Sequence, residues 1–195
     1  MQLRAALVSS AMLACCACSG QLDSPHTVTD GGVVSGVREG EVFVYKGIPV
    51  AAPPVGPLRW RAPQPVSHWS GMLEADKYKP QCMQNWPPLP TMPAEPVSED
   101  CLYLNLWAPA EAAKSKRPAK RPVMVWIHGG GFRAGSASTP LYWGNELAHR
   151  YGVVVVNLSY RVGPLGFLVH PELTAESGYG ASGNYGLLDV IAGLK

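Results

Sequence analysis

The chain has 195 residues, and its 47% hydrophobic content supports one sizeable core, which excludes a fibrous or largely disordered protein. Its 16 basic and 14 acidic residues leave a formal net charge of +2, so no strong field attracts nucleic acid or an anionic membrane surface. Nucleic acid is therefore not an expected partner. The basic run at residues 114–121 contains a proline and lies between two strand-like segments, so it is interpreted as a solvated loop.

The N-terminus carries the pattern of an export signal. Arg4 precedes thirteen uncharged and mostly apolar residues, 5–17, and a polar segment follows. This pattern predicts a signal peptide at residues 1–18, because a membrane-spanning helix needs about 20 apolar residues. The segment MLACCACSG also resembles the lipobox of bacterial lipoproteins, which makes Cys16 and Cys18 lipidation candidates, and cleavage without a lipid is the alternative. We expect an exported protein, periplasmic or extracellular, that is attached to a membrane if it carries the lipid.

The next segments predict a tether, a hairpin and irregular chain. Residues 19–32 are small and polar and are interpreted as a tether. Two short apolar runs flank Glu39 and Gly40, which predicts a β-hairpin. The proline-rich residues 51–65 predict an extended, irregular segment.

Cysteine usage indicates one disulfide. Cys15, Cys16 and Cys18 belong to the predicted leader, so Cys82 and Cys101 remain as a pair in the mature protein. In an exported protein this pair is expected to form a disulfide, worth roughly 3 kcal/mol by loop entropy, and two reduced thiols are the alternative. The five prolines between the two cysteines exclude a helix or a central strand and predict a surface loop.

After Cys101 the pattern changes to that of an α/β protein. The expected order is strand 102–109, strand 122–127, helix 140–152, strand 153–160 and a final helix at 184–195. The strands lack strict alternation, which predicts a sheet buried on both faces with at least one parallel crossover. The final helix has an apolar face that includes Leu187 and Ile191, and no later element covers it, so we expect a fragment of a longer protein.

The segment VMVWIHGGGF, residues 123–132, leads from a strand into three consecutive glycines. One interpretation is a bare turn. The other is that successive backbone N–H groups approach an oxyanion, which the absence of side chains allows. A phosphate-binding P-loop is excluded, since no lysine precedes Ser136, and His128 has no second ligand at metal-binding spacing. Phe132 is expected to return the chain to the core.

Four longer motifs favour the second interpretation. They are SEDCLYLNLWAP, PVMVWIHGGGF, NLSYRVGPLGFL and GNYGLLDVIAGLK, and in this order and spacing they resemble the type-B carboxylesterase and cholinesterase family of α/β-hydrolases. The resemblance covers about residues 30–195. It implies an incomplete α/β fold, the N-terminal part of an α/β-hydrolase with a mixed sheet and crossover helices, in which residues 33–195 form the first portion of a carboxylesterase type-B domain.

The resemblance implies an exported serine ester hydrolase that acts through an acyl-enzyme on small, neutral carboxylic esters without a cofactor or metal. It makes Gly130 and Gly131 the expected oxyanion-hole donors. The chain contains no G-x-S-x-G, and Ser182 in GASGN lacks the second glycine and a preceding strand, so it is not assigned as catalytic. The catalytic serine, acid and histidine are expected outside this chain, which alone is expected to be inactive. The alternatives are a non-catalytic binding or adhesion protein on the same fold and a truncated product without function.

The resemblance also implies residues that hold the scaffold. The matching pairs are the disulfide Cys82–Cys101 and the buried ion pairs Arg59–Glu99 and Arg161–Asp189. Removing one partner of a buried ion pair costs about 3–5 kcal/mol. Cholinesterases place a tryptophan for the choline cation in the loop between these cysteines, but Trp86 has no clearly matching position, so choline-ester specificity is not supported.

Overall fold

The structure, a computed structural model, describes residues 24–85, 96–110 and 120–195. The predicted signal peptide, the lipidation candidates Cys16 and Cys18, Trp86 and most of the basic run lie outside these ranges. None of the helices within these ranges has the length and hydropathy that a membrane span requires.

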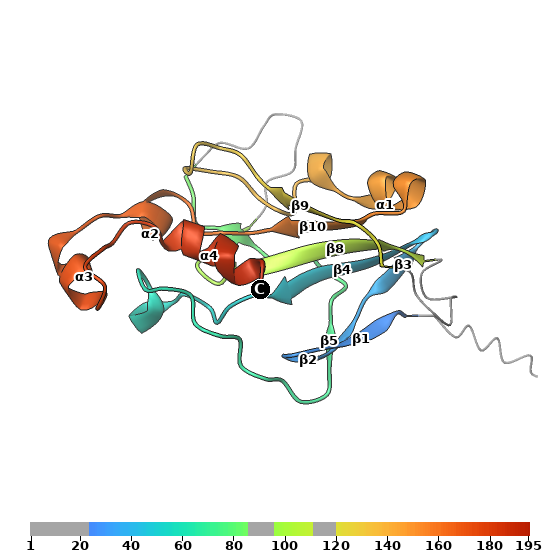
Figure 1. Cartoon of the computed structure of the whole chain (residues 1–195), viewed down its shortest axis with the longest axis horizontal. Coiled ribbons are helices and arrows are strands. Elements are labelled where there is room, and N and C mark those ends of the chain that lie inside the picture. Colours follow the sequence, from blue (N-terminus) through green and yellow to red (C-terminus); the bar gives the residue numbers. More distant parts are fainter. Residues whose placement is uncertain (1–23, 86–95, 111–119) are drawn as a thin grey trace, which may run out of the picture.

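A five-stranded mixed sheet forms the centre of the described structure (Figure 1). In spatial order its strands are β3 (Val37–Glu39), β4 (Val42–Pro49), β8 (Tyr103–Pro109), β10 (Val154–Leu158) and β9 (Val123–Ile127). Neighbouring strands from β3 to β10 are antiparallel, whereas β10 and β9 are parallel. The predicted hairpin, formed by β3 and β4, and the predicted parallel crossover are both confirmed.

The crossover between the parallel strands contains η3 (Pro140–Tyr142) and helix α1 (Asn145–Tyr151). Glu146 lies in the first turn of α1 and Arg150 in its last turn, where their charges complement the helix dipole. The helix buries Ala148 in a core cluster that contains the fully buried Trp107 and Val155. Helix α1 therefore covers the face of the sheet on which β8 and β10 place these apolar side chains.

A second core cluster lies at the end of the sheet where α2 (Gly163–Phe167), α3 (Pro171–Glu176) and α4 (Tyr185–Gly193) gather (Figure 1). Leu102, Tyr160 and Val162 are buried there beside both cysteines. Helix α4 confirms the predicted final helix. The sequence does not predict α2 and α3, because five and six residues are too few to show helical periodicity.

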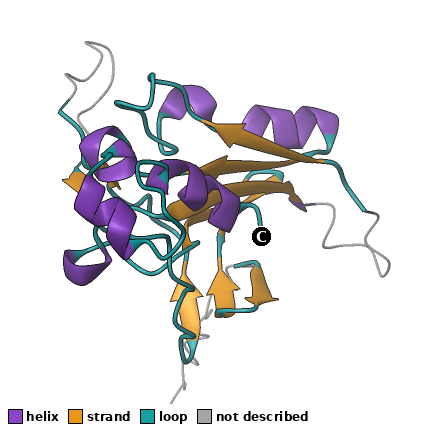
Figure 2. Cartoon of the chain, turned by 60° about the vertical axis from the view of Figure 1, so that its left-hand side comes forward, coloured by secondary structure: helices purple, strands orange, loops and turns teal. Residues whose placement is uncertain are grey.

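A separate three-stranded sheet corrects the expectation of a polar tether at residues 19–32. β1 (His26–Thr29) pairs antiparallel with β2 (Gly32–Ser35), which pairs in parallel with β5 (Met72–Glu74). In Figure 2 these strands lie below the main sheet, away from the helices. The tether prediction is wrong from residue 26 onward, because Thr-Val-Thr favours extended chain and residues 30–31, Asp-Gly, make a two-residue hairpin loop.

Strand β9 differs from the other strands of the main sheet in its exposure. All five of its residues are between 37% and 60% exposed, and among the described strands it pairs only with β10. On β10, by contrast, Val155 and Leu158 point to opposite faces and are both buried. Within the described residues, the prediction of two buried faces therefore holds for β10 and is wrong for β9.

Candidate active site

The glycines after β9 form a turn in which two of them have positive φ. The angle is +125° at Gly130 and +59° at Gly131, backbone conformations that other residues rarely adopt. At Gly130 a Cβ would also overlap the carbonyl group of Ala134, whereas at Gly131 a Cβ would meet open space. The fold therefore needs glycine at 130 for both space and conformation, and at 131 for conformation alone.

Within the turn, the Gly130 carbonyl accepts hydrogen bonds, and two backbone N–H groups have no acceptor among the described residues. The N–H groups of Arg133 and Ala134 donate to the Gly130 carbonyl at 3.0 and 3.3 Å. Within the described ranges, the N–H groups of Gly130 and Gly131 have no protein acceptor. Adjacent N–H groups of this kind are able to bind an oxyanion. The oxyanion role of these two glycines stays a prediction that this geometry allows.

The buried side chain of His128 contacts the backbone of the turn. Its ring is 3% exposed and stacks on Tyr160 with centroids 4.3 Å apart, and its Nδ1 lies 3.1 Å from the Gly129 carbonyl. The Tyr160 hydroxyl donates to the His128 carbonyl at 2.8 Å. Burial lowers the pKa of His128, and the hydrogen bond to Gly129 opposes this only in part, so the ring is neutral near pH 7. Among the described residues, no group of three His, Cys, Asp or Glu side chains is arranged to hold a metal ion.

Two buried asparagines fix the chain that follows the turn. Asn105 on β8 and Asn157 on β10 are direct neighbours in the sheet, and their Nδ2 groups donate to the Ala137 carbonyl at 3.2 and 3.3 Å. Asn157 also donates to the Tyr142 carbonyl at 2.8 Å. The sequence does not predict a role for either residue, because a polar residue within an apolar strand gives no indication of the loop that it binds.

Phe132 departs from the expectation that it returns the chain to the core. Its φ is +60° and its side chain is 52% exposed, so this prediction is wrong. Three successive residues with positive φ turn the backbone outward. The Phe132 ring packs against Phe167 with centroids 4.8 Å apart, and its carbonyl accepts a hydrogen bond from the Gly163 N–H at 2.7 Å. It therefore adds apolar surface next to Gly131.

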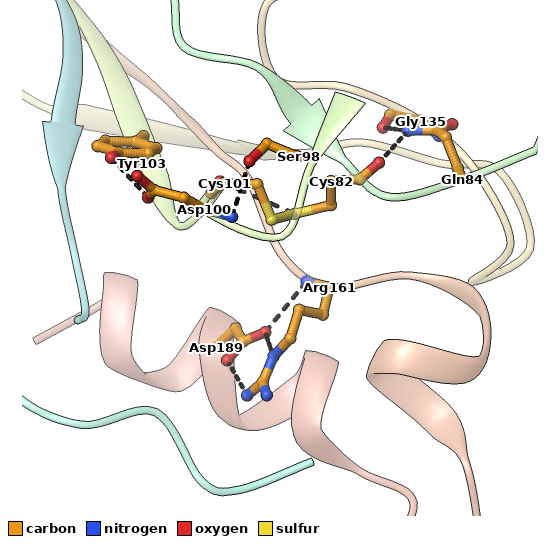
Figure 3. The surroundings of a disulfide bond; sticks show 9 residues. All are labelled: Cys82, Gln84, Ser98, Asp100, Cys101, Tyr103, Gly135, Arg161 and Asp189. Carbon is orange, nitrogen blue, oxygen red and sulfur yellow. Dashed lines mark hydrogen bonds and ion pairs between the residues drawn. A yellow bond between two sulfur atoms is a disulfide. The ribbon is translucent and has the colours of Figure 1, made fainter. Parts of the chain in front are cut away.

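The predicted disulfide is present between Cys82 and Cys101 (Figure 3). Short segments beside the cysteines pair as parallel strands, β6 (Gln81–Cys82) and β7 (Val97–Ser98). The disulfide is confirmed, and the loop between these strands lies mostly outside the described residues.

Both predicted ion pairs form, but they differ in burial. Arg161 and Asp189 are 3% and 1% exposed, and the carboxylate accepts three hydrogen bonds of 2.7–3.0 Å from the arginine's main chain and side chain. Arg59 donates two hydrogen bonds of 2.6 Å to Glu99, whereas these side chains are 39% and 24% exposed. The prediction of a buried ion pair is therefore confirmed for Arg161–Asp189 and wrong for Arg59–Glu99. Water and salt screen the attraction between the charges of the more exposed pair.

A small cavity lies between the disulfide and the two arginines. Its volume is about 10 Å³, room for about one water molecule, and its lining includes Arg59, Glu99 and Arg161. The glycines of the turn do not line it. The cavity is therefore a gap within the scaffold and too small for an ester substrate.

Ser182 lies in a loop that closes onto the start of α3. Its hydroxyl is 2.7 Å from the hydroxyl of Thr174 and 3.3 Å from both the main-chain nitrogen and the carbonyl oxygen of His170. The His170 ring instead accepts a hydrogen bond from the Glu172 N–H. The serine therefore makes loop contacts without a histidine ring as its partner, in agreement with its not being assigned as catalytic.

Comparison with known proteins identifies the family. Residues 23–195 match the carboxylesterase family. Fumonisin B1 esterase from Sphingopyxis macrogoltabida is 49% identical over 179 residues, which cover 91% of this chain and 32% of that protein. Acetylcholinesterase from Bungarus fasciatus is 42% identical over 180 residues, 88% of this chain and 28% of that protein. A solved structure of PNB esterase aligns with a TM-score of 0.73 and 44% identity, over 87% of this chain and 33% of that one.

These matches define both the family and the extent of the chain within it. The chain spans about a third of the length of the relatives it matches. The two solved structures of PNB esterase each cover 87% of this chain, with TM-scores of 0.73 and 0.75. This chain therefore belongs to the carboxylesterase family, and its architecture is an incomplete α/β-hydrolase fold.

Proposed function

We propose that this chain is the N-terminal part of a serine carboxylic-ester hydrolase, and that its glycine turn binds the oxyanion formed during acyl transfer. The observation that carries the proposal is the pair of N–H groups at Gly130 and Gly131, which have no acceptor within the described residues. Family membership supports the reaction class, since two relatives carry the names fumonisin B1 esterase and para-nitrobenzyl esterase.

The turn acts on the oxygen of the ester carbonyl. When a serine oxygen attacks the carbonyl carbon, the π electrons move to the carbonyl oxygen, and the two glycine N–H groups stabilise the charge that develops there. The proton of the serine hydroxyl passes to a base and then to the departing alcohol as the ester C–O bond breaks, which leaves an acyl-enzyme that water hydrolyses to the acid. Loss of one such donor typically lowers kcat by about 10²- to 10³-fold.

The other catalytic groups are proposed to lie outside these residues. The buried ring of His128 stacks on Tyr160 and bonds to the Gly129 carbonyl, so it does not act as the base for a nucleophile. The chain contains no G-x-S-x-G segment. We therefore expect residues 1–195 alone to hydrolyse p-nitrophenyl butyrate no faster than a nonspecific protein, and to leave a serine-reactive fluorophosphonate unbound.

The coding sequence downstream of Lys195 tests the proposal most directly. A G-x-S-x-G segment there, together with ester turnover by the longer protein, supports an esterase. Another residue at the serine position indicates a binding or adhesion protein on the same fold, and a stop codon indicates a truncated product. Stoichiometric fluorophosphonate labelling of Ser182 in the 195-residue chain would contradict the proposed location of the nucleophile.

The proposal includes export and a small neutral ester as substrate. The leader pattern at residues 1–18 supports export, and so does a disulfide, since disulfides persist in oxidising compartments. Mass spectrometry of the mature N-terminus distinguishes a lipidated Cys16 or Cys18 from a cleaved, unmodified end. Cytoplasmic protein that retains the intact leader would contradict export.

A further inference from the structure

We propose that Gln84 is a positioning residue of the oxyanion turn, an inference that rests on the proposed function. The side-chain amide of Gln84 forms two hydrogen bonds with the backbone of Gly135 (Figure 3). Its Oε1 accepts from the Gly135 N–H at 2.8 Å, and its Nε2 donates to the Gly135 carbonyl at 2.9 Å. The Nε2 group also donates to the carbonyl of Cys82 at 3.1 Å. One side chain therefore connects the disulfide to the chain that leaves the glycine turn.

Gly135 transmits this connection because it packs directly against the start of the turn. Its φ is +130°, and a Cβ at this position would overlap the His128 ring and crowd the Gly129 carbonyl. The preceding residue, Ala134, places its carbonyl group so close to Gly130 that no Cβ fits there. A displaced Gly135 peptide would therefore move groups that pack against both Gly129 and Gly130.

The chemistry of glutamine suits this position. Its amide presents an acceptor and a donor in one plane, which matches the N–H and carbonyl of a single backbone residue. The two hydrogen bonds between Gln84 and Gly135 are partly buried. In such surroundings, loss of one partner leaves the other polar group without its hydrogen bond, at a cost in free energy. The disulfide restrains the backbone two residues before Gln84, so less freedom is lost when the side chain binds Gly135.

Gln84 bonds to the backbone of Gly135 and not to the two donor N–H groups, so its effect on the reaction passes through the turn. The oxyanion exists only in the transition state and the tetrahedral intermediates. A misplaced donor therefore lowers kcat more than it raises KM. Displacement of a catalytic group by about 1 Å can cost on the order of 10²-fold in rate.

The test compares two variants of Gln84 with a matched control in the longer protein that carries this chain. Gln84→Met keeps the size and removes all three side-chain hydrogen bonds, and Gln84→Glu keeps an acceptor for the Gly135 N–H. The control is Gln64→Met, because Gln64 is exposed and its Nε2 donates to the nearby Ala62 carbonyl at 2.9 Å. Each variant is measured for kcat, KM, melting temperature and affinity for a trifluoromethyl ketone, whose adduct places an oxyanion in the hole.

For Gln84→Met we expect kcat to fall by about 10- to 100-fold while KM changes by less than about 3-fold. The affinity of Gln84→Met for the ketone should fall by the same factor as its kcat/KM. Gln84→Glu should lose less of its kcat and of its affinity for the ketone. Gln64→Met should match the wild type in both quantities. Hydrogen exchange at the Gly135 amide, which requires no activity, should accelerate in Gln84→Met.

Four results would overturn the proposal, and they are distinguishable. If Gln84→Met lowers kcat no more than Gln64→Met, or lowers melting temperature without weakening ketone binding, Gln84 does not position the turn. If exchange at the Gly135 amide is unchanged, the hydrogen bonds do not hold this residue. A wild-type protein without ester turnover would overturn the proposed function itself and the role of Gln84 with it.

Discussion

The glycine turn and the region around the disulfide contact each other but are held by different interactions. The turn depends on backbone conformation, with positive φ at Gly130 and Gly131 and hydrogen bonds between neutral groups. The disulfide region is held by a covalent bond and by side-chain charges, including the buried pair Arg161–Asp189. The first region therefore requires positions without side chains, whereas the second is held by side chains that bind one another.

This difference separates two kinds of mutational effect. Changes in the disulfide region remove bonds that hold the fold, so their main effect is on the free energy of unfolding. Changes at the turn alter groups that act on the transition state, so their main effect is on kcat. Gln84 joins the two regions, and for this reason its variants need measurements of both quantities.

The largest expected loss of stability comes from Asp189→Asn. It leaves the charge of Arg161 buried without a counter-charge, at a cost of about 3–5 kcal/mol in the free energy of unfolding. Urea unfolding at pH 7 measures this cost, and Glu99→Gln in the more exposed pair is the matched control. Equal losses for the two variants would show that burial does not distinguish the pairs.

The three consecutive glycines provide a graded test of the turn in the longer enzyme. Gly131→Ala should lower kcat by about 10²- to 10³-fold, because relief of the strained φ turns the N–H away from the oxyanion and the donor is lost. The loss of stability should be small, since the added Cβ has room. Gly130→Ala should lower both kcat and stability, because its Cβ would overlap the Ala134 carbonyl. Gly129→Ala is the control, with open space and no positive φ. Unchanged kcat in Gly131→Ala would favour a bare turn.

Removal of the disulfide should affect both regions. The double variant Cys82→Ser/Cys101→Ser releases a loop with a sequence separation of 19 residues, which predicts a loss of roughly 3 kcal/mol in stability. It should also lower kcat, because Gln84 loses its restrained neighbour. Peptide mapping without reductant verifies the bond in the exported wild type, and recovery of two free thiols would contradict it.

Much of the fold could be predicted because its central elements are long or distinctive. Strands β8 and β10 are apolar runs of ordinary length, and α4 is long enough to show helical spacing. Strands β1 and β5 have only four and three residues, and β5 pairs with β2 about 40 positions earlier in the chain. A single sequence contains no signal for that pairing, although the Asp-Gly at residues 30–31 does indicate the β1–β2 hairpin.

The candidate site was predictable to a different degree in each of its parts. Consecutive glycines and paired cysteines are rare enough to be noticed, and the family motifs identify the ion pairs. The contacts of Gln84 and Asn105 depend on loops 51 and 32 residues away, so their residue types alone give no indication of a role. Burial of the ion pairs was not predictable either, because it depends on how many elements cover each pair.

The smallest expected effect is the pH dependence contributed by Glu99. Hydrogen bonds from Arg59 lower the pKa of Glu99, and the charge of the arginine adds to this effect, although partial burial opposes it. A carboxyl whose pKa is lower in the folded state stabilises the fold above its unfolded pKa, and this contribution is lost as pH falls through the folded pKa.

Glu99→Gln should therefore flatten the acid limb of stability measured by urea unfolding below about pH 5. Gln64→Met, which changes no titratable group, is the control and should leave that limb unchanged. Identical acid limbs in the wild type and Glu99→Gln would show that solvent screening removes the advantage of the two short hydrogen bonds between Arg59 and Glu99.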